Sequence, residues 1–170
     1  MLSPKEVSKY AKRKENENLR FRTYLKIHAN EETLDKQFHQ LHQELFSGYD
    51  CSKCRNCCKM YNGFLPEANL ADAAKHLEIT EKQLIDFFLE YNESTGDYET
   101  KHMPCDFLKK DGSCMLGDSK PDNCSNYPYT DLPERLASLY SVLESVEVCP
   151  VAYEIWERLK VEYGFLERRK

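Results

Sequence analysis

Apolar side chains in the first third of the chain recur at helical spacing. A charged helix is expected to begin after Ser3, because Pro4 suits the first helical turn, and to run to about Ala29. Its stretch from residue 12 to 18 is almost wholly polar, which predicts a solvated segment or a kink. A second helix should follow the capping residue Asn30, end near Gly48 and dock one apolar stripe on the core. That stripe consists of Leu34, Phe38, Leu41 and Leu45.

The middle of the chain alternates irregular and helical segments. Residues 51–63 show no periodicity, which predicts a loop wrapped around a ligand. A short Ala-rich helix is expected from Pro66 to about Leu77. The segment Thr80-Glu81-Lys82-Gln83 has the pattern of a capping box, so a further helix should start there and end near Tyr91.

The last third predicts one small β element between helices. Residues 105–108 and 113–116 flank an Asp-Gly pair, which favours a tight β-hairpin that sets two cysteines face to face. Pro133 should start another helix, and the apolar residues around Trp156 mark a terminal one. The predicted fold is therefore mainly α: a small helical metal-binding domain with a short β-hairpin and irregular cysteine-ligand loops.

A chain of 170 residues has the length of one ordinary domain with appendages. We expect residues 1–47 to form an N-terminal helical extension that packs on the core. Residues 48–163 should form a cysteine-cluster metal-binding domain, and residues 164–170 a charged C-terminal tail.

Composition restricts the classes of partner. The chain is 31% charged, with a mean hydropathy of −0.73, so a bound metal could supply stability that a polar chain lacks. The net charge is −5, and basic residues are interleaved with acidic ones, which argues against nucleic-acid binding. No run approaches the apolar length of a membrane span, and the N-terminus leads into charge rather than a signal peptide. We therefore expect a cytoplasmic protein that does not engage membranes.

Thiols are kept reduced in the cytosol. Eight cysteines in a cytoplasmic protein therefore indicate metal or redox chemistry rather than a framework of disulfides. The segment Cys51-x2-Cys54-x2-Cys57 has the spacing at which a turning loop directs successive thiolates at one centre, as in zinc knuckles and ferredoxin-type loops. The remote Cys149, which precedes proline, could be a further ligand, and Cys124 competes for that role. The candidate metal ligands are Cys51, Cys54, Cys57, Cys58, Cys105, Cys114, Cys124 and Cys149.

Adjacent cysteines at 57 and 58 should point in different directions unless the backbone is sharply bent, which favours two neighbouring sites or a bridged centre. Eight thiolates would carry much negative charge, and three cations of the same loop can offset part of it. Backbone N–H groups bonded to sulfur would offset more. The three cations are Lys53, Arg55 and Lys59.

Other interpretations compete at individual positions. Taken alone, any one of the four cysteines after position 58 could be a small hydrophobic residue buried in the core. These are Cys105, Cys114, Cys124 and Cys149. His39 and His42 lie three residues apart on a predicted helix, where a solvated helix face is the preferred interpretation over metal binding. His102 precedes Cys105 by three residues and could complete a zinc site.

The run Cys51-Ser52-Lys53-Cys54-Arg55-Asn56-Cys57-Cys58 resembles the CxxCxxCC pattern of the YkgJ-type cysteine-cluster family, described as zinc- or iron-chelating. Cys105-Asp106-Phe107-Leu108, the segment from Cys114 to Pro128, and Cys149-Pro150 are similar to that family in the same order. The family commonly has Arg-Pro where this chain has Lys120-Pro121. An arginine also often follows the next cysteine, where this chain has Ser125.

The resemblance implies metal chelation and supplies no reaction. We expect a metal-binding protein that holds an iron–sulfur cluster or zinc through clustered thiolates, with the cluster favoured by the remote Cys-Pro. One alternative is an iron–sulfur-dependent modifying enzyme related to lysine N-methylases, although no Gly-rich cofactor loop is present. The other is an interaction module stapled by zinc. The expected ligand is a metal ion or an iron–sulfur cluster. A protein partner is compatible with the sequence, which does not identify one.

Overall fold

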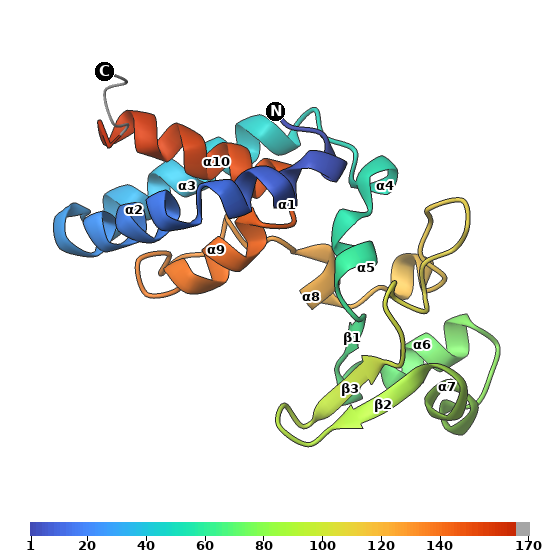
Figure 1. The fold of residues 1–170 in the computed structure, drawn as a ribbon. Coiled ribbons are helices and arrows are strands. Elements are labelled where there is room, and N and C mark those ends of the chain that lie inside the picture. The colour runs from blue at the N-terminus through green and yellow to red at the C-terminus, as the bar shows by residue number, and fades with distance from the viewer. Residues whose placement is uncertain (166–170) are drawn as a thin grey trace. The chain divides into compact units, whose positions relative to one another are not determined.

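A computed structural model describes residues 1–165, and within them the chain divides into two compact units. The helical unit consists of Met1–Asp50 and the described part of Pro128–Lys170, and the cysteine unit is the continuous segment Cys51–Tyr127. Among the described residues, no helix has both the length and the apolar character needed to cross a membrane. Figure 1 shows the chain as a ribbon. As predicted, the fold is mainly α with a short β-hairpin.

The helical unit contains helices from both ends of the chain. The first predicted helix is broken into two at Lys14, within the polar stretch that predicted a kink. On the second of these helices, Phe21 and Leu25 are buried whereas Leu19 and Ile27 are exposed. The helices of this unit are α1 (Pro4–Arg13), α2 (Glu15–His28), α3 (Glu31–Phe46), α9 (Leu139–Val146) and α10 (Pro150–Glu162).

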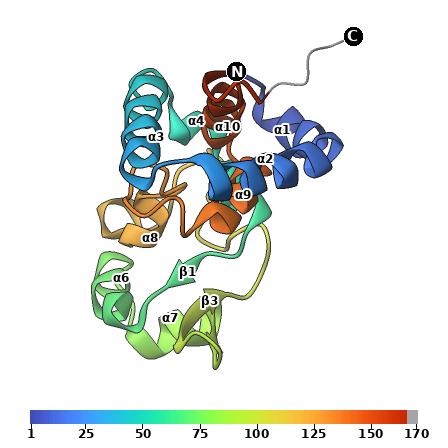
Figure 2. The same cartoon turned by 90° about the vertical axis from the view of Figure 1, so that its left-hand side faces the viewer.

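Helix α3 forms as its local sequence predicts. The Asn30 side chain accepts a hydrogen bond from the Thr33 N–H at 3.0 Å, which satisfies one of the unpaired donors at the start of the helix. All four residues of the predicted stripe are buried. Helix α10 packs against both α3 and α1 and lies between them in the view of Figure 2. Its Trp156 meets the Phe21 ring edge-on at 5.0 Å.

A buried lysine joins α10 to α2. The Lys160 side chain is fully buried, and its Nζ donates to Oε1 of Glu17 at 2.5 Å and to Oδ1 of Asn18 at 2.7 Å. It also donates to Oε1 of Glu157 at 2.7 Å, while the other oxygen of Glu157 pairs with Lys14. The core of the helical unit thus contains a fully hydrogen-bonded ionic network.

The segment before α9 is irregular, so the predicted helix from Pro133 is wrong. Asp35 of α3 accepts hydrogen bonds from the backbone N–H groups of Glu134 and Arg135, at 2.8 and 2.9 Å. The Arg135 guanidinium donates to the Tyr129 carbonyl at 2.6 Å. These side-chain bonds satisfy the backbone in place of a helical ladder, and the helix starts only at Leu139.

The cysteine unit contains short elements around a small sheet. Strand β3 is central, with β1 and β2 antiparallel on either side of it. Thr80 and Gln83 form the predicted capping box, but the helix that follows ends at Phe88, where the chain enters β2. The elements are α4 (Cys51–Cys54), α5 (Asn56–Met60), β1 (Phe64–Leu65), η1 (Glu67–Asn69), α6 (Leu70–His76), α7 (Glu81–Phe88), β2 (Leu89–Asn92), β3 (Asp97–Thr100), η2 (Gly117–Ser119) and α8 (Asp122–Ser125).

The hairpin forms at a different place from the one predicted. Strands β2 and β3 pair over four residues each, whereas the predicted site shows one isolated bridge between Leu108 and Cys114. The turn itself is present there, because the Lys109 N–H donates to the Ser113 carbonyl at 2.9 Å. The domain boundaries at residues 47/48 and 163/164 stay a prediction, and most of the predicted charged tail lies outside the described residues.

Candidate metal centre

Two short helical turns stand where a loop was predicted. Helices α4 and α5 carry the first four cysteines and are separated by Arg55, which has the left-handed φ of 49°. A residue other than glycine in this conformation costs about 1 kcal/mol and bends the chain sharply. Lys59 holds the bend, because its Nζ donates to the Cys54 carbonyl at 2.9 Å.

The adjacent cysteines of α5 lie close together, although both follow the bend at Arg55. The Sγ atoms of Cys57 and Cys58 are 4.0 Å apart, so the expected divergence of these side chains is wrong. Two thiolates on one tetrahedral zinc, each about 2.3 Å from the metal, would lie about 3.8 Å apart. The two side chains are therefore close enough to serve one centre.

Cys105 reaches the same place from a distant part of the chain. Its backbone N–H donates to the Cys58 carbonyl at 2.9 Å. A Cβ atom added at Gly63 would stand 2.6 Å from the Cys105 Sγ and 2.9 Å from Cγ2 of Thr100, closer than non-bonded atoms can approach. Glycine at position 63 thus lets strand and thiol meet.

Gly63→Ala should lower the free energy of unfolding by about 1–3 kcal/mol, because the added methyl group overpacks the contact with Cys105. Urea denaturation of the purified protein measures the change. Gly48→Ala is the matched control, since an added Cβ there meets nothing within 4 Å. Equal stability of the Gly63→Ala and Gly48→Ala proteins would contradict the close approach.

Burial dominates the electrostatics of Cys105 and raises the pKa of its thiol to about 11. The neighbouring thiols of Cys58 and Cys114 act in the same direction. Hydrogen bonds from the Phe107 backbone N–H and the Thr100 hydroxyl oppose them. The Cys58 and Cys114 thiols therefore lie near enough to Cys105 to affect it, and donors to its sulfur are already in place.

Cys124 belongs to the same group. Burial raises the pKa of its thiol, the charge of Lys120 and the backbone N–H of Phe64 lower it, and the thiols of Cys58 and Cys114 raise it further. The short helix α8 that carries Cys124 is tied to β1, because the Asn123 amide donates to the Phe64 carbonyl at 3.2 Å.

Cys58 has the opposite shift. The hydrogen bond with Cys57 lowers the pKa of the Cys58 thiol to about 6, against the opposing effect of burial. The positive charges of Arg55 and Lys120 also lower it. The gathered thiols thus include one that favours the thiolate form, which is the form that binds metal.

The predicted ligands are distributed unevenly. The structure brings together the thiols of Cys57, Cys58, Cys105, Cys114 and Cys124 in the cysteine unit. Cys51 is exposed and Cys54 half-buried on α4. Cys149 is nearly buried in the helical unit, at the N-cap of α10, and its role as a ligand stays a prediction.

Within residues 1–165, no three Cys, His, Asp or Glu side chains stand in an arrangement that could hold a metal ion as they are. Coordination would require the gathered thiols to turn and close further. Their chemistry nevertheless fits the metals considered, because thiolates are preferred ligands of zinc and of iron–sulfur clusters. The residues present are therefore suited to the group that the sequence implies.

The histidines take other partners. His102 Nδ1 is 2.9 Å from Asp106 Oδ1 on an exposed part of the cysteine unit. His42 is not on a solvated face, as its Nδ1 is 2.9 Å from the buried Thr130 hydroxyl and its Nε2 is 3.7 Å from Asp131. The expected solvated face is therefore wrong for His42, whereas His39 is exposed as expected.

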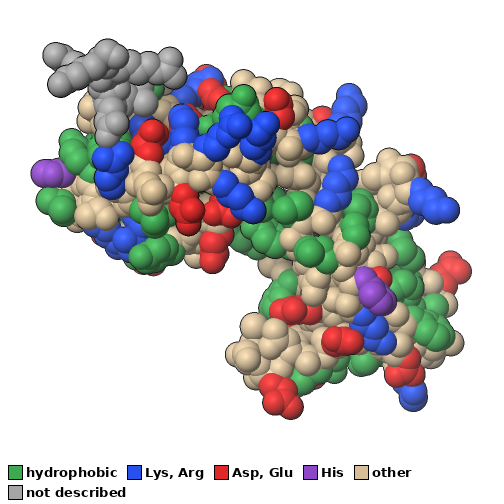
Figure 3. Space-filling view, in the orientation of Figure 1, with side chains coloured by type: hydrophobic (Ala, Val, Ile, Leu, Met, Phe, Trp, Pro, Cys, Tyr) green, Lys and Arg blue, Asp and Glu red, His purple; other side chains and the backbone are tan. Residues whose placement is uncertain are grey.

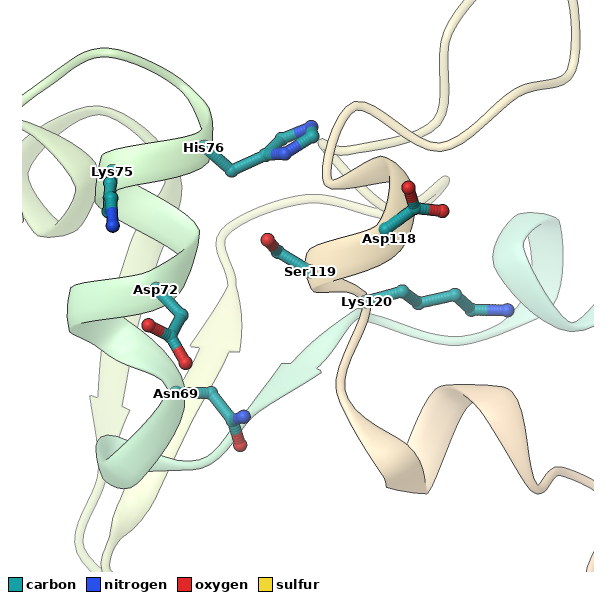
Figure 4. A pocket seen from close by; sticks show the side chains of 7 residues that line it. All are labelled: Asn69, Asp72, Lys75, His76, Asp118, Ser119 and Lys120. Carbon is teal, nitrogen blue, oxygen red and sulfur yellow. The ribbon is translucent and has the colours of Figure 1, made fainter.

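A polar cavity of about 460 Å³ lies between α6 and η2. In Figure 4, Asp72 and His76 extend from α6 toward the side of Ser119. The Lys120 side chain runs away from α6, in keeping with its influence on the thiols of Cys58 and Cys124. Lys120 thus lines this cavity with part of its side chain and acts on two cysteines through its charge.

One comparison with known proteins gives a match. The family model described as "CxxCxxCC: Putative zinc- or iron-chelating domain" matches residues 50–150. The chain belongs to this family. No curated protein and no solved structure matches it. Membership in the CxxCxxCC family supports metal binding in general, and the family description names both zinc and iron.

Three residues around the thiols escaped the sequence analysis as parts of the site. Gly63 is the last residue of the cysteine-rich segment. A glycine at that position was the one sequence feature that could have indicated a close approach to the site. Thr100 and Phe64 contribute through strand pairing, which local sequence does not reveal.

Proposed function

We propose that this CxxCxxCC protein holds an iron–sulfur cluster in the cytoplasm through thiolates of its cysteine unit. The observation that carries the proposal is that four separate segments bring thiols near one another, since those of Cys58 and Cys114 raise the pKa of both the Cys105 and the Cys124 thiol. Cys58, Cys105, Cys114 and Cys124 supply one thiol each. Cys57 adds a fifth sulfur, 4.0 Å from that of Cys58.

The remote Cys-Pro and the surroundings of the sulfurs favour a cluster over zinc. Seven of the eight cysteines belong to the cysteine unit, more than the four thiolates that either one tetrahedral zinc or one cluster requires. Cys51 and Cys54 would add ligands from the turn that precedes the bend, and Cys149 completes the predicted set. Backbone N–H groups of Phe64 and Phe107 that donate to sulfur are the kind of contact that tunes a cluster.

The protein's own residues would bind and balance the centre. Arg55 and Lys120 place positive charge beside the thiolates, so the lysine at position 120 can take over the charge of the arginine common in the family. Thr100 donates to Cys105 and also accepts from the Gly63 N–H at 2.7 Å, which holds that thiol in place. A bound cluster would supply one-electron redox chemistry.

Anaerobic purification followed by elemental analysis and absorption spectroscopy tests the proposal. We expect brown protein that contains iron and acid-labile sulfide, because sulfur-to-iron charge transfer absorbs visible light whereas zinc thiolates are colourless. Colourless protein with stoichiometric zinc after strictly anaerobic preparation would overturn the cluster and retain metal chelation. Protein that binds neither metal would contradict both.

A further inference from the structure

Strand β2 forms an outer edge of the three-stranded sheet. The pattern of hydrogen bonds between β2 and β3 shows which backbone groups of β2 point away from the sheet. The Lys101 N–H donates to the Phe88 carbonyl at 3.0 Å, so residues 88, 90 and 92 exchange hydrogen bonds with the neighbouring strand. Leu89 and Tyr91 occupy the alternate positions, and their backbone groups therefore point away from β3.

Tyr91 provides most of the hydrogen-bonding capacity of this edge. The Leu89 N–H is already used, because it donates to the Ile85 carbonyl at the end of α7. The Leu89 carbonyl and both backbone groups of Tyr91 point outward. The Tyr91 side chain is 56% exposed and packs edge-on against Tyr98 at 5.3 Å. An exposed outer strand of this kind is a template for pairing with another chain.

The hairpin that carries this edge is acidic. Residues 87–100 include four acidic side chains and no Lys or Arg, and Figure 3 shows acidic side chains over this region. Glu90 lies directly opposite Glu99 in the register of the two strands. Like charges at opposed positions destabilise a sheet, so a cation beside this pair would relieve the repulsion.

We propose that the β2 edge binds an extended, lysine- or arginine-rich segment of a partner protein, which joins the sheet as a fourth strand. Main-chain hydrogen bonds to Leu89 and Tyr91 supply the pairing, as in other strand-addition complexes. Alternate side chains of the added strand lie on the face of Glu90, where basic residues meet the acidic pair. The exposed Tyr91 ring lies on the opposite face of the strand, where it can contact the apolar residues that alternate with the basic ones.

Hydrogen exchange tests the pairing directly. The probe is a short peptide of alternating lysine and valine, blocked at both ends, added to the full-length protein. We expect binding that weakens as salt rises, together with slower exchange of the Tyr91 amide in the complex. A peptide of alternating glutamate and valine should not bind. An unchanged exchange rate for Tyr91 in the peptide-saturated protein would overturn strand addition.

Charge reversal tests the recognition. Glu90→Lys should weaken peptide binding about tenfold and yet raise the melting temperature, because it replaces the repulsion from Glu99 with an attraction. Asp72→Lys makes the same change of charge on the exposed face of α6 and should leave the affinity near that of the wild type. Equal weakening by the two substitutions would indicate general attraction to an acidic protein and contradict a site at β2.

Discussion

Replacing Cys58 with serine is expected to remove most of the metal bound by the anaerobically prepared protein, together with its visible absorption. Cys58 lies where the segments meet, with its sulfur beside that of Cys57 and its carbonyl bonded to Cys105. A hydroxyl is a poor substitute for a soft thiolate as a metal ligand. Serine retains the backbone bond to Cys105, so the loss should come from the missing sulfur. Metal analysis per protein chain gives the result.

Ser52→Ala is the matched control for this experiment. It changes a small polar side chain of the same cysteine-rich segment without removing a thiol, and it should leave the metal content unchanged. If the Cys58→Ser protein kept the full metal content of the wild type, Cys58 would not be a ligand. Other residues would then have to bind the metal.

Lys160→Ala should destabilise the protein by about 3–5 kcal/mol, the usual cost of removing one partner from a buried ion pair. The substitution leaves the carboxylates of Glu17 and Glu157 and the buried Asn18 amide without their shared donor. Thermal and urea unfolding, followed by the near-ultraviolet signal of Trp156, measure the effect on the helical unit.

An exposed ion pair provides the comparison. Lys36 donates to Glu32 at 2.7 Å on the surface of α3, where both side chains are largely exposed, and Lys36→Ala should change stability little. A similar small effect for Lys160→Ala would show that water or another side chain replaces the lost donor.

The parts of the fold that depend on local sequence were predictable. The cap at Asn30 and the apolar stripe of α3 lie within one helix, and the capping box at Thr80 spans four residues. The hairpin was misplaced because the Asp-Gly pair near Gly112 formed a turn with only one isolated bridge beside it, whereas the paired strands are β2 and β3. Strand β3 also pairs with β1 across more than thirty residues of chain, a contact that local sequence does not reveal.

The candidate site was predictable in its residue types and not in its geometry. The spacing of the cysteines indicated metal chemistry. The sequence indicated neither the approach of the Cys57 and Cys58 sulfurs nor the left-handed backbone of Arg55, a conformation that usually belongs to glycine. The burial of Lys160 was equally hidden, because its partner Asn18 lies 142 residues away and a lysine normally indicates a surface.

The order of the two units along the chain has a consequence for synthesis. The cysteine unit is one continuous segment, whereas the helical unit combines the first fifty residues with residues that follow position 127. A ribosome completes the cysteine unit before α9 and α10 exist, and only then can Trp156 and Lys160 join the earlier helices. The segment that contains the first seven cysteines can therefore begin to fold while nearly half of the helical unit is still to be translated.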